Sequence, residues 1–191
     1  MTNTMLSIPL HPTKLLVMRV ALQRGFTLIE LMVAVAILAI LAVLAAPSFN
    51  DAILSNKLSS YSNNFVASAT LARGEAIKRN AVVKMCRSAD GASCATSGGW
   101  QQGWIVFNDP DDNGSLDSGE TLIQRQQALS ADYSFTGNVY AVGFQPVGVG
   151  ATTANLTLCR ATPTVGSQGR DVKVSATGRV SVSKTTTGTC L

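Results

Sequence analysis

The first regular pattern in the chain is a dense apolar run over residues 26–46, which reads FTLIELMVAVAILAILAVLAA. The run has one charged residue, Glu30, and no glycine or proline. A helix of about 20 mostly apolar residues crosses the hydrocarbon core of a bilayer. A cleaved secretory signal has a shorter apolar core of about 7–15 residues, and Pro47 directly after the run disfavours cleavage there. We therefore expect residues 26–46 to form a transmembrane helix.

Beyond Pro47 the apolar positions recur at helical spacing, with polar side chains between them. This spacing predicts an amphipathic helix over residues 47–80 that packs on a globular domain. Pro47 can kink a long helix without ending it. Lys78 and Arg79 suit the C-terminal end of the helix dipole, and Asn80 predicts the stop. The expected packing positions are Phe49, Ile53, Leu58, Tyr61, Phe65, Ala69, Ala72 and Ala76.

From residue 81 onward the pattern changes to a period of two with many β-branched residues, which is typical of strands. Glycine-rich loops at 98–103 and 148–150 separate some of them, and no linker splits the region. The pattern predicts an α+β protein with one antiparallel β domain over residues 81–191. The expected strands are residues 81–87, 103–108, 121–127, 133–137, 139–145, 154–160, 170–176 and 179–184.

Charge and composition narrow the function. The only histidine is His11, ahead of the apolar run, so histidine-based catalysis and histidine-rich metal sites are excluded. The sequence shows no pairing of a catalytic nucleophile with a general base, and we expect that the protein is not an enzyme. Ahead of the run stand three basic residues and no acid, and the positive-inside rule places that end in the cytoplasm. The segment after Pro47 then lies across the membrane. These basic residues are Lys14, Arg19 and Arg24.

All four cysteines fall in the segment expected to be exported. An even number in an exported domain predicts two disulfides, and the absence of a CxxC pair or a nearby histidine disfavours zinc. Cys86 and Cys94 flank a turn at Asp90-Gly91. Cys159 lies in an expected strand, and Cys190 follows a threonine-rich stretch. We expect the pairs Cys86–Cys94 and Cys159–Cys190.

An acidic segment over residues 109–120, DPDDNGSLDSGE, has the spacing of a calcium-binding loop. Two helices flank such loops in helix–loop–helix proteins, whereas strands are expected on both sides here. Asp-rich and Asn-Gly segments also form ordinary hairpin turns. We expect a hairpin loop without a cofactor, with calcium as the alternative, because these carboxylates repel one another without a counter-ion. The calcium ligands would be Asp109, Asp111, Asn113, Asp117 and Glu120, with the Ser115 carbonyl.

The segment from Arg24 to Leu31, RGFTLIEL, resembles the class III signal of type IV pilins and type II secretion pseudopilins. The resemblance implies that residues 1–25 are a leader, that a prepilin peptidase cuts between Gly25 and Phe26, and that Phe26 is then N-methylated. A start at Met18 would give a shorter basic leader, MRVALQRG.

Glu30 has two interpretations. A carboxylate near the edge of a membrane can snorkel to the interface, and a carboxylate at membrane depth marks a functional residue by default. The pilin resemblance implies that Glu30 pairs with the free amine of a neighbouring subunit's Phe26. In a low dielectric the two charges attract strongly and relieve each other's burial cost. Glu30 would then set the register of assembly.

Residues 100–125 resemble the GspH/FimT group of minor pseudopilins and minor pilins, including FimU-like proteins. The resemblance implies a pilin-like fold, with a long N-terminal helix on a small β-sandwich-like domain. It implies a non-enzymatic, single-pass inner-membrane subunit with a periplasmic domain. Such a subunit incorporates into, primes or caps a type IV pilus or a type II secretion pseudopilus. Its partners would be the prepilin peptidase, other pilins or pseudopilins and the inner-membrane assembly platform.

Two other functions stay open, a calcium-dependent adhesive domain on a membrane anchor and a DNA-binding minor pilin for DNA uptake. DNA binding needs clustered lysine and arginine side chains on one surface. Strand alternation places Arg170 and Lys173 on different faces of the sheet, and Arg179 and Lys184 likewise. This division disfavours a dense basic patch. Aromatic residues are also too few for a base-stacking platform. The first interpretation of these four residues is a solvated sheet face, and the alternative is a phosphate-binding stripe.

Overall fold

The computed structural model describes residues 25–161, 168–185 and 190. Residues 1–24 of the expected leader, which include the alternative start at Met18, lie outside this part. The chain divides into two compact units, Met1–Ala45 and Ala46–Leu191, and one helix, α1 (Leu28–Arg79), runs from the first into the second. The expected helix over residues 26–80 is therefore present. Its backbone stays helical through Pro47, so the proline does not end it.

The two ends of α1 follow from local chemistry. At the N-terminus, the Thr27 hydroxyl oxygen accepts a hydrogen bond from the Glu30 N–H at 3.2 Å. At the C-terminus, Asn80 adopts a left-handed backbone with φ of 51°, and the Ala81 N–H donates to the Ala76 carbonyl at 3.3 Å. A helix C-cap of this kind needs a residue with a left-handed backbone, which is usually glycine and sometimes asparagine. Asn80 therefore ends the helix, as expected.

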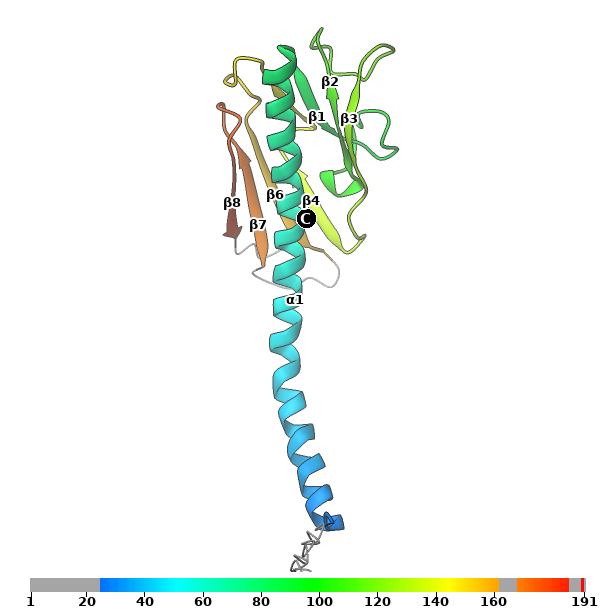
Figure 1. Ribbon diagram of the computed structural model, residues 1–191, viewed down its shortest axis with the longest axis vertical. Coiled ribbons are helices and arrows are strands. Elements are labelled where there is room, and N and C mark those ends of the chain that lie inside the picture. Colours follow the sequence, from blue (N-terminus) through cyan, green and yellow to red (C-terminus); the bar gives the residue numbers. More distant parts are fainter. Residues whose placement is uncertain (1–24, 162–167, 186–189, 191) are drawn as a thin grey trace, which may run out of the picture. The chain divides into compact units, whose positions relative to one another are not determined.

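The second unit contains two four-stranded antiparallel sheets (Figure 1). The first sheet has the order β3-β2-β1-β5 and the second the order β4-β6-β7-β8. All eight expected strands are present, each end within two residues of its expected position. A short 3-10 helix, η1 (Trp100–Gln102), stands in the expected loop at 98–103. The strands are β1 (Val83–Arg87), β2 (Trp104–Asn108), β3 (Leu122–Gln126), β4 (Tyr133–Gly137), β5 (Ala141–Phe144), β6 (Ala154–Arg160), β7 (Gly169–Val174) and β8 (Val180–Thr185).

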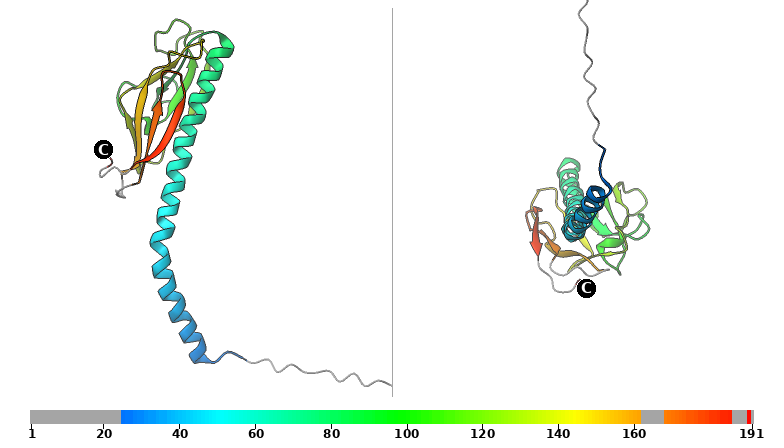
Figure 2. Two further views of the ribbon diagram at one scale, coloured as in Figure 1. Left: turned by 90° about the vertical axis from the view of Figure 1, so that its left-hand side faces the viewer. Right: turned by 90° about the horizontal axis from the view of Figure 1, so that it is seen from below.

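The core of this unit lies between the C-terminal part of α1 and the inner faces of both sheets (Figure 2). Phe65 of α1 is its centre, and its ring centroid lies 5.2 Å from Trp100, 5.7 Å from Trp104 and 5.4 Å from Phe135. Edge-to-face aromatic pairs of this kind add stabilisation beyond the area they bury. The core thus joins the helix to β2 and β4, which belong to different sheets.

The buried face of α1 begins later than the sequence pattern indicates. Leu58, Phe65 and the three expected alanines are fully buried, but Phe49 and Ile53 are 72% and 53% exposed. Among the α1 side chains whose burial the structure describes, Leu54 is the first buried apolar one. The expectation that Phe49 and Ile53 pack on the domain is wrong, because helical spacing shows which side chains share a face but not where the partner surface starts.

Candidate functional site

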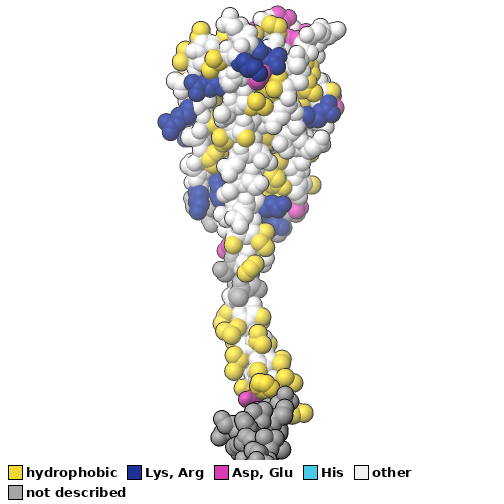
Figure 3. All heavy atoms as spheres, viewed as in Figure 1, with side chains coloured by type: hydrophobic (Ala, Val, Ile, Leu, Met, Phe, Trp, Pro, Cys, Tyr) yellow, Lys and Arg dark blue, Asp and Glu magenta, His cyan; other side chains and the backbone are white. Residues whose placement is uncertain are grey.

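The processing motif stands at the start of α1, and its side chains are uncovered. Phe26 is 83% exposed, and every described residue from Phe26 to Leu44 is exposed. Figure 3 shows hydrophobic side chains covering this part of the helix. Over this stretch α1 is long and apolar enough to cross a bilayer, by length and composition. A helix that is apolar all round needs a surrounding apolar medium, which a membrane or neighbouring helices supply.

Glu30 occupies the third helical position after the Thr27 cap. Thr27 and Glu30 have the spacing of a capping box, and the carboxylate lies at the positive end of the helix dipole. Sequence reasoning assigned Glu30 to assembly and missed this local role, although Thr-x-x-Glu before an apolar run was the signal. Among the described residues none forms an ion pair with Glu30. The carboxylate is thus available to a partner beyond its own chain.

The acidic loop between β2 and β3 is organised around a lysine that sequence reasoning missed. The Lys84 ammonium lies 2.9 Å from Asp109 Oδ2, 2.8 Å from Asp112 Oδ1 and 3.0 Å from the Asp112 carbonyl oxygen. Asp109 is fully buried. Burial alone lowers the pKa of Lys84, but the hydrogen bonds to Asp112 and Asp109 outweigh it and raise that pKa. The signal was strand pairing, because Asp109 directly follows the strand that pairs with the strand of Lys84.

Asp109 also receives backbone hydrogen bonds from its own loop. The Gly114 N–H donates to Oδ2 at 2.9 Å, and the Asn113 N–H donates to Oδ1 at 3.1 Å. Burial raises the pKa of Asp109, but the bonds from Lys84 and Gly114 outweigh that effect and hold the pKa below its usual range. The loop therefore has a charged carboxylate at its base, held by one ammonium and two amides.

The structure brings the expected calcium ligands together only in part. Carboxylate oxygens of Asp109, Asp111 and Glu120 lie within 4.8 Å of one another. Asn113, however, turns its amide nitrogen toward Asp111 and Asp117, at 2.8 and 2.7 Å, and its oxygen accepts from the Ser115 N–H. The Asp117 N–H donates to Glu120. Lys84 and these donors compensate some of the carboxylates, and the loop joins the paired strands β2 and β3.

The four basic residues expected on the C-terminal strands do not form one stripe. Arg170 is only 5% exposed and faces α1. Lys184 stands opposite Arg170 in the β7–β8 ladder and is exposed on the same face, whereas Lys173 is exposed on the other face. Arg179 is exposed at the turn before β8. The favoured interpretation, a solvated sheet face, is wrong for Arg170, and so is the alternative of a phosphate-binding stripe, because strand parity directs its side chain into the packed face.

The structure joins Cys86 to Cys94 and Cys159 to Cys190, the pairs that the sequence analysis favours. The turn between the first two cysteines is organised by Asp90. Its carboxylate accepts hydrogen bonds from the Ser93 hydroxyl, the Ala92 and Ser93 N–H groups and the Ser88 hydroxyl. These bonds hold the pKa of Asp90 far below its usual range. The turn keeps its carboxylate ionised and its backbone donors satisfied.

An uncovered N-terminal apolar helix that continues into a small antiparallel β domain defines a pilin-like protein. The family model of the type II transport protein GspH matches residues 62–178, and the prokaryotic N-terminal methylation motif matches residues 21–46. The first match covers more than half of the chain, which therefore belongs to the GspH family of pilin and pseudopilin proteins.

Relatives agree with this assignment. The chain is 31% identical over 89 residues to the type IV major fimbrial protein FimA of Dichelobacter nodosus, over 47% of this chain and 48% of that protein. FimA of strain VCS1703A is 56% identical over 39 residues, 20% of this chain and 24% of that protein. The chain spans about half the length, or less, of the curated relatives it matches.

Solved structures show the same fold. The type IV minor pilin FimU of Pseudomonas aeruginosa, in one crystal form, matches with a TM-score of 0.53 at 18% identity, over 71% of this chain and 96% of that one. A second crystal form of FimU gives a TM-score of 0.51 at 17% identity, over 70% and 100%. At these low identities, the comparison shows that the chain and FimU share a fold.

Proposed function

We propose that this chain is a non-enzymatic minor subunit of a type IV pilus or type II secretion pseudopilus. A prepilin peptidase cuts it between Gly25 and Phe26, and its domain then lies on the periplasmic side of the inner membrane. The observation that carries the proposal is the methylation motif, with Phe26 and Glu30, at the start of a helix whose apolar residues are exposed up to Leu44, in a chain of the GspH family.

Processing and assembly are coupled by charge. Before the cut, the Phe26 nitrogen belongs to a neutral peptide bond, and the Glu30 carboxylate is stabilised by the helix dipole and has no ion-pair partner among the described residues. The cut creates an ammonium at Phe26. A neighbouring subunit can then place this ammonium against Glu30, and in a low dielectric the pair offsets the burial cost of both charges. Helices that pack in the wrong register leave both charges unpaired, so the pair selects the register.

The test is incorporation into filaments. Cells carry wild type, Glu30→Ala or Glu30→Asp as the sole copy, and the chain is measured in sheared filaments and in membranes. We expect Glu30→Ala in membranes at the wild-type level and several-fold depleted from filaments, because an apolar residue favours insertion but offers no partner to the amine. Glu30→Asp, which keeps the charge, should be less depleted. Equal incorporation of Glu30→Ala and wild type would contradict the proposed role of Glu30.

A further inference from the structure

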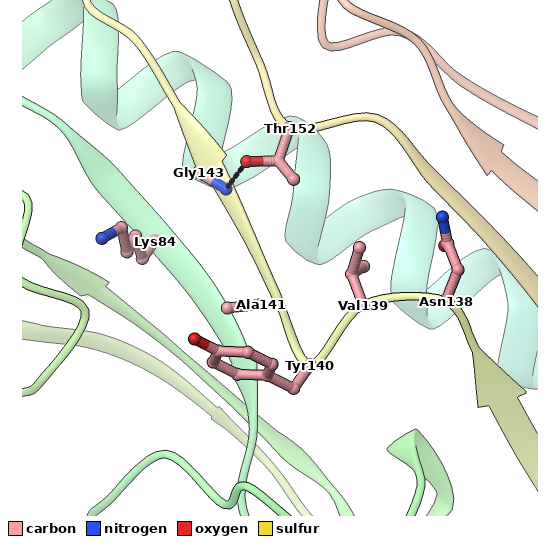
Figure 4. A pocket seen from close by; sticks show the side chains of 7 residues that line it. All are labelled: Lys84, Asn138, Val139, Tyr140, Ala141, Gly143 and Thr152. Carbon is pink, nitrogen blue, oxygen red and sulfur yellow. Dashed lines mark hydrogen bonds between the residues drawn. The ribbon is translucent and has the colours of Figure 1, made fainter.

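A surface pocket of about 320 Å³ lies beside β5, on the outer face of the first sheet (Figure 4). This volume stands at the lower limit of pockets that hold small molecules, so it suits a ligand the size of a single ring. Figure 4 shows Tyr140 at one end of the pocket, the hydrogen-bonded pair of Gly143 and Thr152 at the other, and Ala141 between them. The pocket is remote in sequence from the processing motif and has no part in the role proposed above.

Small residues form the floor of the pocket. Ala141 and Gly143 stand opposite Cys86 and Lys84 in the β1–β5 ladder, so all four belong to the outer face of the sheet. A Cβ atom added to Gly143 would lie 3.6 Å from the Thr152 hydroxyl oxygen and 3.7 Å from Lys84 Cε, which is ordinary contact. The glycine therefore leaves space above the sheet that a ligand can occupy without a clash.

The edge of β5 beside this floor is closed to a further strand. The Gly143 N–H donates to the Thr152 hydroxyl oxygen at 3.1 Å, and the Thr152 N–H donates to the Gly143 carbonyl at 3.0 Å. On the other side of Ala141, the Val139 carbonyl accepts from Trp100 Nε1 at 3.0 Å. An added strand would need these backbone groups for its own ladder. The occupant of the pocket is therefore not an extended peptide.

Charge favours a neutral occupant. Lys84 is the only charged residue among the described ones that line the pocket. Its ammonium contacts Asp109, the Asp112 carboxylate and the Asp112 carbonyl, which matches the three N–H donors of a lysine. A charged ligand would lose water in the pocket without meeting a free counter-charge, and that loss costs free energy.

Three exposed side chains keep hydrogen-bonding groups open around the floor. The Asn138 side-chain oxygen accepts from the Asn155 N–H at 2.8 Å, which leaves the two N–H donors of its amide. The Thr152 hydroxyl oxygen accepts from Gly143 and keeps its own proton to donate. Among the residues that the structure describes, none bonds these donors or the Tyr140 hydroxyl. Amide and hydroxyl groups thus stand at different points around an apolar floor.

Tyr140 supplies an aromatic wall that is 54% exposed. The Arg87 guanidinium lies 5.9 Å from the centre of this ring and is not among the residues that line the pocket, so it supports the ring from outside. Arg87 is itself fixed, because it donates to backbone carbonyls just after the Cys86–Cys94 disulfide. The ring is therefore held in place before a ligand binds.

We infer that this pocket binds a single neutral sugar ring of the pyranose type. Such a ring has hydroxyl groups around its rim and an apolar face of C–H groups. The C–H face lies on Tyr140, because partly positive hydrogens are attracted to the negative face of an aromatic ring. The rim hydroxyls accept hydrogen bonds from Asn138 and Thr152, and the edge of the sugar lies over Gly143.

Other small ligands match the open groups less well. A purely apolar ligand would cover the Asn138 and Thr152 donors without bonding them, which leaves buried donors unsatisfied. A nucleotide would bring phosphate charge that the committed Lys84 does not meet. A pyranose combines acceptors around its whole rim with an apolar face, which are the two features that the pocket presents.

The test uses the full chain, ¹⁵N-labelled in dodecylphosphocholine micelles, which contain no sugar, and methyl β-D-glucopyranoside as the probe. The ring substituents of this glucoside are equatorial, so its C–H faces are flat. We expect saturable shifts of the Asn138 side-chain amide and the Gly143 N–H, with half-saturation at about 1 mM or above for so small a ligand. Saturation transferred from the protein should reach the ring C–H protons of the sugar most strongly.

Three comparison compounds test the class of ligand. Sorbitol has similar hydroxyl groups but no rigid C–H face, and it should bind at least tenfold more weakly than the glucoside. Uridine and the blocked peptide acetyl-Thr-Val-Thr-amide should leave the Asn138 and Gly143 resonances unmoved. No shift with the glucoside, an equal shift with sorbitol, or a larger shift with uridine or the peptide would overturn the inference.

Variants test the pocket itself. Tyr140→Ala should weaken the glucoside at least tenfold, whereas Tyr140→Phe, which keeps the ring, should stay within threefold of wild type. Gly143→Val fills the floor and should weaken binding at least tenfold, while the matched change Ser181→Val, on the exposed β8, should leave it unchanged. Tyr140→Ala gives a second reading should Gly143→Val unfold. Wild-type affinity in a folded Tyr140→Ala or Gly143→Val variant would refute this pocket as the site.

Discussion

The Arg170 guanidinium on β7 is bonded to Ser55 on α1, with Nη2 at 3.0 Å from the serine hydroxyl oxygen and 3.3 Å from its carbonyl oxygen. The same nitrogen lies 3.3 Å from the Ser59 hydroxyl oxygen. Ser55 lies one residue beyond Leu54 and Ser59 one turn further, at the start of the buried face of the helix. Arg170 therefore ties β7 to the point on α1 where the helix begins to pack on the domain, and the acceptors of its hydrogen bonds are uncharged serine oxygens.

Removal of this side chain should destabilise the domain. We expect Arg170→Ala to lower the free energy of unfolding by about 1.5–3 kcal/mol, the usual worth of hydrogen bonds to a charged group. Lys173→Ala, on the exposed face of the same strand, should change it by less than about 0.5 kcal/mol. Urea titration followed by fluorescence of the buried Trp100 and Trp104 measures both. Equal losses for the two variants would refute the structural role of Arg170.

The pair of Lys84 and Asp109 should make stability depend on pH. Asp109 has a lowered folded pKa, so its contribution is fully present above the unfolded pKa of about 4 and is lost as the pH falls from there through the lower folded pKa. Lys84 has a raised folded pKa, so its contribution is fully present below the unfolded pKa of about 10.4 and is lost as the pH rises from there through the higher folded pKa. Stability should therefore be greatest between these limits.

Lys84→Met tests this pair, because it leaves Asp109 buried without its counter-charge. We expect a loss of about 3 kcal/mol at pH 7, the low end for breaking a buried pair, since Lys84 is partly exposed. The difference from wild type should shrink as the pH falls below about 4, the ordinary pKa of an aspartate, because protonation removes the charge that Lys84 compensates. A loss that is independent of pH would show that packing, and not charge, accounts for the effect.

Calcium should have little influence on the wild-type fold. Lys84 and the Asn113 amide already compensate the loop carboxylates, and an ion would have to displace them. We expect about 1 mM calcium to leave the thermal midpoint unchanged relative to EDTA, because stabilisation by a ligand requires binding to the folded state. A saturable rise in the midpoint, lost in Asp111→Asn, would instead establish the loop as a calcium site.

The two disulfides should contribute unequally. They close loops with sequence separations of 31 residues for Cys159–Cys190 and 8 for Cys86–Cys94. By chain entropy the losses on replacing each pair with alanine are about 3.7 and about 2.5 kcal/mol. Non-reducing peptide mapping should first show these pairs and no others. A peptide that links Cys86 to Cys159 or Cys190 would contradict the fold around β1 and β6.

The strands and the helix could be predicted from local pattern, because period-two and helical spacing are properties of short segments. The polar contacts could not, because they depend on which strands meet. Alternation correctly placed Arg170 and Lys173 on opposite faces, but only the packing of α1 on β7 shows that Arg170 is buried. Lys84 likewise looked like one more residue of a strand until the pairing of β1 with β2 brought it to Asp109.

The central claim is that this chain is a processed filament subunit, and intact-mass spectrometry of the protein from its own membranes tests it most directly. We predict a chain that begins at N-methylated Phe26 in cells with an active prepilin peptidase. In Gly25→Val, or without the peptidase, the leader should remain, because the cut requires a small residue at that position. A wild-type chain that keeps its leader in the presence of the peptidase would contradict the account.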